Sequence, residues 1–397
     1  MINRSLPRSR QIGTYSAAMS PAMPQRLPSR LLPLAEVLAR IDALARPVEA
    51  RAVEVAAAAG RVLAADVAVE QSLPAAAIAL RDGWAVRSDL VSDAGPYAPV
   101  ALTPPPTFVE VGAPLPPETD AVLPPDAVTV HGGVAEAMAS AVPGDGVFAA
   151  GADAAPGQIL RRTGERLRAV DVALLRATGV PRVLVRAPRL VIVTANVFID
   201  AVDDTVAPPL ARDIARAGGD AEIVPGARDG TSTLDRALEE IRHGDAVVIV
   251  GGSGVGHHDA SVRTLARLGT VHAHGVGLMP GETSALGERG ARPVLIIPGR
   301  LDAALAAWLV LGRHLIMRLT GRDAPEPATP VRLARKIAST VGMAEVVLVR
   351  ACENGVEPVA SGYYPLHALA QADGFVLVAP EREGFPPGAT VAMHALP

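Results

Sequence analysis

The stretch DAVVIVGGSGVGHHDASVRTLARLG, residues 245–269, decides the fold of this chain. It opens with a short, continuous apolar run, which is typical of a buried strand, and passes through a glycine-rich turn at 251–256 into a helix from about Asp259. In an open α/β sheet, ligands bind at the carboxyl ends of strands, and glycine N–H groups beside a helix start attract anions. The stretch therefore predicts a strand–loop–helix unit that holds a phosphate or another oxyanion. The alternative is a tight turn without a ligand.

The same alternation extends on both sides of this stretch. Further apolar runs at 189–195, 221–227 and 293–299 predict strands, and amphipathic segments at 210–219, 232–244 and 301–321 predict helices. Strands that alternate with helices favour a parallel, doubly wound sheet with right-handed crossovers. The segments on either side of this α/β region have a different sequence pattern. Residues 71–147 and the chain after the proline-rich segment 323–330 carry short valine-rich runs between glycines and prolines, which predicts β structure and, at the C-terminus, a small barrel or sandwich.

Composition excludes several classes of protein. The chain has 397 residues, enough for two to four domains at about 150 residues each, and its 49% of hydrophobic residues excludes a disordered chain. A net charge of −4 provides no field for nucleic acid, and no run of about 18 uncharged apolar residues predicts a membrane span. Cys352 is the only cysteine, which excludes a disulfide framework and allows a reducing, cytoplasmic location. Lys336 is the only lysine, so a catalytic lysine elsewhere is excluded.

The first 30 residues lack an acidic residue and are rich in Arg, Ser and Pro. They also lack the apolar middle region of a secretory signal. We interpret this segment as a disordered tail or as the product of a start codon placed too early, with Met19 and Met23 as later candidates. A targeting role is the alternative.

Several residues near the predicted loops have side chains suited to chemistry. Asp259 is a good helix N-cap, and the alternative is a carboxylate that faces a ligand or Mg²⁺. His257 and His258 either donate to an anion or belong only to the loop, since adjacent histidines rarely chelate one metal together. Two Pro-Gly turns, at 280–284 and 297–300, are either ordinary turns or part of the site, and the second should lie on the same rim as the glycine loop. Asp82 precedes Gly83 in a turn that either is structural or presents a carboxylate.

Seven segments in order along residues 31–397 resemble the molybdopterin molybdenumtransferase family, which includes the MoeA-type proteins and the E domain of gephyrin. Each segment is modestly specific alone, but seven in order are strongly specific for this lineage. The segment 111–128, VGAPLPPETDAVLPPDAV, is similar to the family's Thr-Gly-Ala-Pro-Leu-Pro segment. The segments 250–259, 276–287 and 295–305 resemble its Ser-Gly-Gly-Val-Ser-Val-Gly, Met-Lys-Pro-Gly-Lys-Pro and Leu-Pro-Gly-Asn-Pro segments. The remaining similar segments are 73–90, 151–180 and 361–393.

The resemblance implies an α/β multidomain fold and an activity. The implied domains are a mixed domain at 31–70 and 150–186, an inserted β-rich domain at 71–149, a molybdopterin-binding-like α/β domain at 187–322 and a β domain at 323–397. The tail at 1–30, interpreted above as disordered, precedes them. The family inserts molybdenum from molybdate into adenylylated molybdopterin with release of AMP, assisted by Mg²⁺, and its active proteins are homodimers. A client molybdoenzyme is a further implied partner, whereas nucleic acid and membranes are not.

The resemblance also assigns roles to residues. Asp82, Asp204 and Asp259 are the implied catalytic residues and metal ligands. The implied cofactor-binding residues lie in the glycine loop and the two Pro-Gly turns: Gly251, Gly252, Ser253, Gly254, Gly256, His257, Gly281, Pro298, Gly299 and Arg300.

The chain departs from the family pattern at the expected site. The acidic pair of Thr-Gly-Asp-Glu is replaced by Asn196 and Val197, and the two lysines of Lys-Pro-Gly-Lys by Met279 and Glu282. Such cations make charge-assisted bonds worth about 1.5–3 kcal/mol each, so their loss weakens anion binding unless arginines such as Arg300 compensate. Other departures are Ala77, Ile78, Val111 and Leu301, and other nearby arginines are Arg81 and Arg263. The alternative function is therefore a non-catalytic relative that binds molybdopterin or the finished cofactor and aids its delivery to a client enzyme. A third possibility is an interaction module without a pterin ligand.

Overall fold

The computed structural model describes residues 30–195, 205–224, 244–256, 259–325 and 327–397. The chain forms two compact units, Met1–Val48 with Pro188–Pro397, and Glu49–Ala187, which are described separately. Asp204, His257, His258 and nearly all of the helix predicted at 232–244 lie outside the described residues. In the described part of the chain, no helix is long and apolar enough to cross a membrane.

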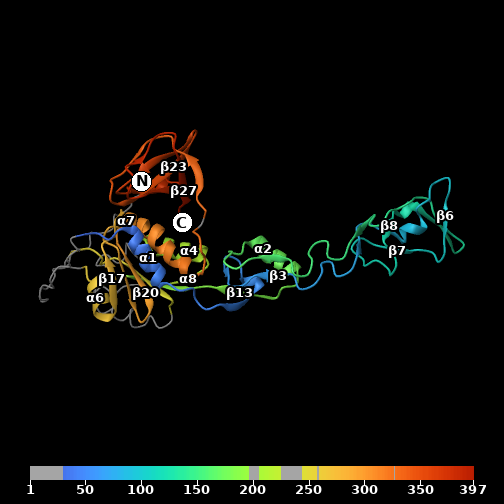
Figure 1. Ribbon diagram of the computed structural model, residues 1–397, viewed down its shortest axis with the longest axis horizontal. Helices are drawn as coiled ribbons and strands as arrows, with labels where there is room; N and C mark the ends of the chain where they lie inside the picture. Colours follow the sequence, from blue (N-terminus) through green and yellow to red (C-terminus); the bar gives the residue numbers. More distant parts are fainter. Residues whose placement is uncertain (1–29, 196–204, 225–243, 257–258, 326) are drawn as a thin grey trace, which may run out of the picture. The chain divides into compact units, whose positions relative to one another are not determined.

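The first unit contains a six-stranded sheet in the order β15-β14-β16-β20-β19-β17. Two of its strands, β17 and β20, are labelled in Figure 1. Four neighbours, β15 (Asp220–Val224), β14 (Arg189–Thr194), β16 (Ala246–Val250) and β20 (Arg292–Ile297), pair in parallel. Among the described residues of this part, the helices are α4 (Ala207–Arg216), α6 (Ser261–Leu268), α7 (Leu301–Ala307) and α8 (Arg313–Leu319), with a π-helical turn at Trp308–Gly312 between the last two. These elements confirm the predicted parallel strands and the α/β multidomain fold class.

The other two strands of the sheet were not expected from the sequence. β17 (Thr270–His274) and β19 (Ala285–Arg289) pair antiparallel to each other, and β19 pairs antiparallel to β20. Both strands are short and carry polar residues or glycine, so they give no apolar run. Gly287 lies where the two backbones approach closely, because a Cβ there would lie 2.2 Å from the Thr270 carbonyl oxygen.

The core of this sheet is aliphatic on both faces, as the low aromatic content requires. On one face, Leu190, Ile192 and Val248 pack with residues of α1 (Leu34–Leu44), α4 and the α7–α8 segment. On the other face, Val247 and Ile249 pack with residues of α6. Burial on both sides explains why these strands read as continuous apolar runs and not as alternating patterns. The carboxyl ends of β16 and β20 therefore lie side by side at one edge of the sheet.

The C-terminal part of this unit is built around β23 (Ala344–Cys352). Its sheet has the order β18-β23-β25-β27-β21, and β24 (Gly355–Ala360) also pairs with β23. β18 (Leu278–Met279) comes from the α/β part and pairs in parallel with β23, which joins the two parts in one unit. The remaining elements are β25 (Gly374–Val378), β27 (Thr390–Ala395), β21 (Thr329–Arg332), β22 (Ile337–Ala338), β26 (Gly384–Phe385) and α9 (Leu366–Gln371).

The second unit brings together chain segments from both sides of the predicted insertion. β1 (Arg51–Glu54) pairs with β13 (Arg182–Arg186), and β3 (Val67–Ala68) pairs with β12 (Ile159–Arg161). The segment between holds two three-stranded sheets, β7-β5-β8 and β6-β10-β9. Its strands are β5 (Gly83–Val86), β6 (Val100–Leu102), β7 (Thr107–Val109), β8 (Ala121–Leu123), β9 (Val128–His131) and β10 (Val134–Ala137). The other short elements are β2 (Val62–Leu63), β4 (Ile78–Ala79), β11 (Val147–Phe148) and α2 (Ala169–Ala177). The finer division into domains stays a prediction.

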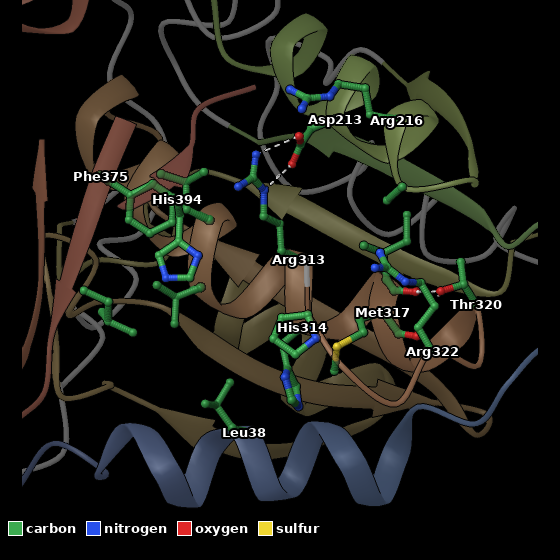
Figure 2. A pocket seen from close by; sticks show the side chains of 16 residues that line it. Leu38, Asp213, Arg216, Arg313, His314, Met317, Thr320, Arg322, Phe375 and His394 are labelled. Carbon is green, nitrogen blue, oxygen red and sulfur yellow. Dashed lines mark hydrogen bonds and ion pairs between the residues drawn. The ribbon is translucent and has the colours of Figure 1, made fainter. Parts of the chain in front are cut away.

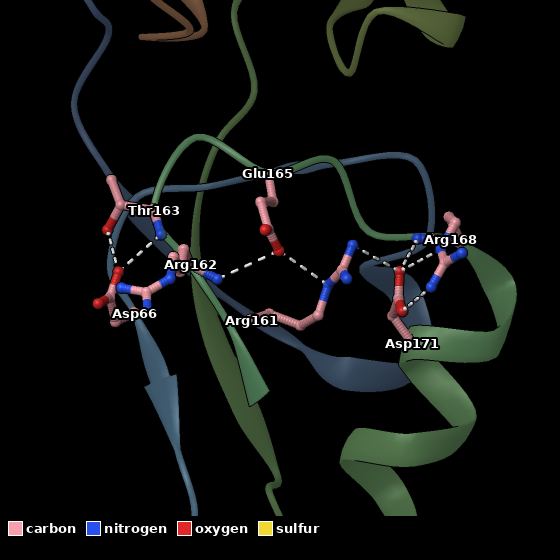
Figure 3. Close-up of polar contacts among 7 residues, drawn as sticks. All are labelled: Asp66, Arg161, Arg162, Thr163, Glu165, Arg168 and Asp171. Carbon is pink, nitrogen blue, oxygen red and sulfur yellow. Dashed lines mark hydrogen bonds and ion pairs between the residues drawn. The ribbon is translucent and has the colours of Figure 1, made fainter. Parts of the chain in front are cut away.

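A charged network anchors the start of α2 (Figure 3). Asp171 is 3% exposed and accepts hydrogen bonds from the Arg168 backbone N–H at 2.7 Å and from its Nη2 at 2.9 Å. Arg161 approaches the same carboxylate at 3.3 Å, and its Nε lies 3.0 Å from Glu165. The Arg168 guanidinium, helped by the backbone bond, holds the pKa of the Asp171 carboxyl below its ordinary value.

Replacing Asp171 by Asn should make the second unit less stable, and the loss should depend on pH. A lowered pKa in the folded state means that the carboxylate stabilises the fold above its unfolded pKa of about 3.9 and loses this effect as pH falls through the folded pKa. We expect D171N to cost about 1–3 kcal/mol at pH 7 and much less near pH 2. Hydrogen–deuterium exchange of peptides from residues 161–177 measures this. The control E54Q, whose pair with Arg182 is more than 60% exposed on both sides, should change protection little; equal losses at both pH values would contradict the assignment.

Candidate functional site

Three loops meet at the carboxyl ends of β16 and β20 and enclose a pocket of about 230 Å³. The first is the glycine loop after β16, the second is the Pro-Gly turn after β18, and the third follows β20. The sequence predicted that the first and third lie on one rim, and the structure confirms it. The lining residues are Gly252, Ser253, Gly254, Asp259, Glu282, Thr283, Pro298, Gly299, Arg300 and Ala303.

The glycine loop is held by the first residue of α6. Ser261 donates from Oγ to the Gly251 carbonyl oxygen at 2.9 Å, and its backbone N–H donates to the Gly252 carbonyl at 3.1 Å. Gly252 has φ +66°, and a Cβ at this position would lie 2.3 Å from the Ser261 Oγ. Both the left-handed backbone and the close approach therefore require glycine at 252. Gly251 is fixed to β20 as well, since its N–H donates to the Ile297 carbonyl at 2.8 Å.

Replacing Gly252 by Ala should distort the glycine loop where it contacts Ser261. The added methyl group meets Ser261 and forces a strained φ, so we expect a loss of about 1–3 kcal/mol in the free energy of unfolding. Thermal unfolding of the purified protein, together with titration of molybdate, measures stability and binding. The matched control is Gly290→Ala, since a Cβ at Gly290 would meet nothing within 4 Å. If the two substitutions have the same effect, the close contact with Ser261 is not what requires glycine.

Asp259 closes a turn in the glycine loop and does not cap the helix. Its Oδ2 accepts from the Gly256 N–H at 2.8 Å, while its own N–H donates to the Gly256 carbonyl at 3.0 Å. Helix α6 begins at Ser261, and its N-cap residue, Ala260, makes no side-chain cap bond. The N-cap interpretation was therefore wrong, because the turn places the carboxylate one residue too early and directs it into the loop. Asp259 lines the pocket, and its role as a ligand stays a prediction.

The second loop contributes Glu282, which the family resemblance already placed at the expected site, and Thr283, to which the sequence assigned no role of its own. The Thr283 Oγ1 lies 2.9 Å from the Ser253 Oγ, which joins this loop to the glycine loop. Glu282 Oε2 accepts from the Gly281 N–H at 3.0 Å. The Pro-Gly turn was visible in the sequence, but the contact between the two hydroxyls depends on the tertiary fold. The pocket thus pairs hydroxyl groups with a carboxylate where the family has lysine.

The third loop supplies the only cation among the residues that line this pocket in the described chain, Arg300. Its Nε donates to Asp302 Oδ1 at 2.6 Å, and Asp302 is 3% exposed. The guanidinium also lies 5.5 Å from the centre of the Tyr363 ring. The Asp302 carboxylate further accepts from the Tyr364 N–H at 3.4 Å. Residues of α7 and of the C-terminal part therefore fix a positive charge at the rim, 60% exposed and accessible to a ligand.

The other predicted site residues that the structure describes lie outside this lining. Gly251 and Gly281 are buried beside it, and Gly256 belongs to the turn that Asp259 closes. Asp82 belongs to the second unit, where its Oδ1 accepts from the Val111 N–H at 2.7 Å. Within the described residues, no three His, Cys, Asp or Glu side chains are grouped so that they could hold a metal ion. The roles assigned to these residues stay predictions.

Comparison with known proteins defines the class to which this fold and pocket belong. The model of the MoeA N-terminal region (domains I and II) matches residues 32–179. The model of a probable molybdopterin-binding domain matches residues 189–318, which include the three loops, and the model of the MoeA C-terminal region (domain IV) matches 330–396. The chain belongs to the MoeA-type molybdopterin molybdenumtransferase family, which functions in molybdenum cofactor biosynthesis.

Individual relatives agree with this assignment. Molybdopterin molybdenumtransferase 1 of Mycobacterium tuberculosis is 29% identical over 73% of this chain and 79% of its own length. A putative molybdopterin biosynthesis protein of Methanocaldococcus jannaschii is 24% identical over 87% of this chain and 92% of its own. The crystal structure of a MoeA molybdopterin biosynthesis protein from Pyrococcus horikoshii superposes with a TM-score of 0.78 at 25% identity, over 93% of this chain and all of that one.

Proposed function

We propose that this chain inserts molybdenum from molybdate into adenylylated molybdopterin and releases AMP. The three-loop pocket carries the proposal, because it lies in the segment that matches the molybdopterin-binding model and at the strand ends where α/β sheets bind ligands. Molybdate and the phosphates of the pterin are anions. A pocket with glycine backbone, two hydroxyls and an arginine suits such anions.

In this proposal the chain's own residues bind and orient the anions. The Ser253 and Thr283 hydroxyls lie 2.9 Å apart, so the hydroxyl that accepts this hydrogen bond keeps its own proton for an oxyanion oxygen. The narrow glycine backbone lets a phosphate approach the loop. Arg300 supplies the charge that the family's lysines would provide, and Asp302 and Tyr363 hold it in place. A fixed guanidinium binds an oxyanion without losing much rotamer entropy.

The residues present also fit an assisting Mg²⁺ ion. Mg²⁺ is commonly held by one or two carboxylates, substrate phosphates and water, so it does not need a group of three protein ligands. Asp259 and Glu282 are the two carboxylates on the pocket wall and would hold the ion in this unit. When bound, the ion would neutralise phosphate charge and so favour departure of AMP. Asp82 and Asp204 stay candidates from the family resemblance.

One observation favours the alternative function, a non-catalytic relative that binds and delivers the cofactor. The Glu282 carboxylate lies in the pocket and accepts the Gly281 N–H, a donor that an oxyanion would otherwise use. A negative charge at this position opposes the binding of molybdate and phosphate. In the alternative function the pterin still binds, but no molybdenum is inserted. Homodimer formation, a client molybdoenzyme and a cytoplasmic location are proposals that come with either function.

Release of AMP distinguishes the two functions. Purified protein is incubated with adenylylated molybdopterin, Mg²⁺ and molybdate, and AMP is followed by chromatography together with the fluorescence of the acid-oxidised pterin. We expect AMP release that depends on molybdate. Retained pterin without AMP would support the non-catalytic function, and absence of both from folded protein would contradict both.

A further inference from the structure

A second pocket of about 240 Å³ lies in the same unit, where α1, α4, α8 and the C-terminal strands β25 and β27 meet (Figure 2). None of its lining residues lines the three-loop pocket. The volume is below the range of about 300–1,000 Å³ that is common for drug-sized ligands, so only a small molecule fits. The proposed reaction uses none of these residues.

Most of the wall is apolar and comes from elements on all sides. Leu38 of α1 and Met317 of α8 face the cavity together with Phe375 and Leu377 of β25. The other apolar lining residues are Ala217, Leu309, Val310, Ile316 and Pro325. A ligand for this pocket therefore carries an apolar body.

The charged part of the wall is almost entirely basic: Arg216, Arg313, Arg322, His314 and His394 line the pocket, against one acid, Asp213. The Asp213 carboxylate is already engaged, because Arg313 donates to both of its oxygens at 2.7 and 2.9 Å and Trp308 Nε1 donates at 2.8 Å. This leaves an excess of positive charge and favours an anionic ligand group.

Three of the five basic side chains already bind other groups in the protein. Arg313 binds Asp213, His314 lies 2.8 Å from Asp42, and Arg216 donates to the Leu396 carbonyl at 3.0 Å. Arg322 and His394 make no ion pair with a residue that the structure describes.

His394 stacks on Phe375, with ring centres 5.0 Å apart (Figure 2). Burial, and to a lesser degree the nearby Arg313, lowers the pKa of the His394 imidazole. The charged groups around it are the other basic side chains of the wall and Asp213. An anion beside this ring would favour its protonated form.

We propose that this second pocket binds a small apolar monocarboxylate, with the carboxylate on Arg322 and the apolar body against the apolar wall that begins at the neighbouring Met317. The single negative charge matches the basic wall, and the small volume limits the body to a short alkyl chain or one aromatic ring. The proposal does not depend on the function of the three-loop pocket.

Phenylacetate and its uncharged analogue phenylacetamide test the charge requirement. Both are titrated into the full-length protein by isothermal calorimetry and ligand-observed NMR. Because charge-assisted hydrogen bonds are stronger than neutral ones, we expect phenylacetate to bind about tenfold more tightly or better. Equal binding of the two compounds, or no binding of phenylacetate at millimolar concentration to folded protein, would overturn the proposal.

Variants locate the site. R322Q should weaken binding of phenylacetate about tenfold and leave binding of phenylacetamide nearly unchanged. L377W should fill the cavity and abolish binding of both, while R300A, at the other pocket, should bind phenylacetate as the wild-type protein does. R322Q keeps the test decisive even if L377W fails to fold, because Arg322 lies at the end of the helical segment, outside the core clusters. Wild-type affinity in R322Q would contradict the assignment.

Discussion

Replacing Arg300 by Ala should lower the affinity of the three-loop pocket for molybdate and for the pterin phosphate by about 10- to 100-fold. A charge-assisted hydrogen bond is worth about 1.5–3 kcal/mol, and each 1.4 kcal/mol is about tenfold in affinity. Arg300 is the one cation among the lining residues described, so no neighbouring charge in the lining replaces it. Glu282 would then dominate the local charge, which adds to the loss.

Binding of molybdate and of molybdopterin to the variant is measured by calorimetry and by pterin fluorescence. R300K keeps the charge but lacks the planar fork, so we expect an intermediate loss. Tyr363→Phe keeps the ring under the guanidinium and should bind like wild type, whereas Tyr363→Ala should lose about two- to fivefold, since an exposed cation–π contact is worth about 0.5–1 kcal/mol. Wild-type affinity in R300A would show that anions bind without this residue.

Replacing Asp213 by Ala should destabilise the first unit by about 3–5 kcal/mol, the range measured when one partner of a buried ion pair is removed. Asp213 is 5% exposed and neutralises Arg313, and it also satisfies the indole N–H of the fully buried Trp308. Its removal leaves a half-buried charge and a buried donor without their acceptor. Arg313 also donates to the Ala395 carbonyl, so the loss should extend to the attachment of β27.

Urea unfolding followed by Trp308 fluorescence measures this loss. The chain has two tryptophans, and Trp84 belongs to the second unit, so a W84F background reports on the first unit alone. The matched control is Glu222→Gln, whose pair with Arg189 is about half exposed and should contribute no more than about 1 kcal/mol. If D213A and E222Q lose equal stability, the buried network does not carry the effect.

The sequence predicted the parts of the fold that give strong apolar patterns. The runs at 189–195, 245–252 and 293–299 form strands that pair in parallel. They were predictable because both faces of these strands are buried, which gives continuous apolar runs. β17 was missed because it is an edge strand of five residues with polar side chains, and β19 was missed because Gly287, Glu288 and Arg289 interrupt its apolar pattern. The single helix predicted at 301–321 covers two helices joined by a π-helical turn, a backbone detail that periodicity does not resolve.

The loops of the pocket were predictable where the sequence itself marks a turn. The glycine loop and the turn after β20 were found because glycine and proline mark both turns directly. Thr283 and Tyr363 were not found, because their roles depend on contacts with Ser253 and Arg300 across the fold. Asp259 was misread as a cap because a helix-start aspartate and a turn-closing aspartate look alike in sequence.

Complementation tests the central claim, that the three-loop pocket still transfers molybdenum despite its replaced residues. The chain, and its R300A variant, are expressed in a bacterial strain that lacks its own molybdenumtransferase, and a molybdoenzyme is assayed at low molybdate. We expect restored molybdoenzyme activity with the wild-type chain and a strong loss with R300A. No restoration from soluble, well-expressed wild-type protein would contradict the transferase function and leave the non-catalytic binding function in its place.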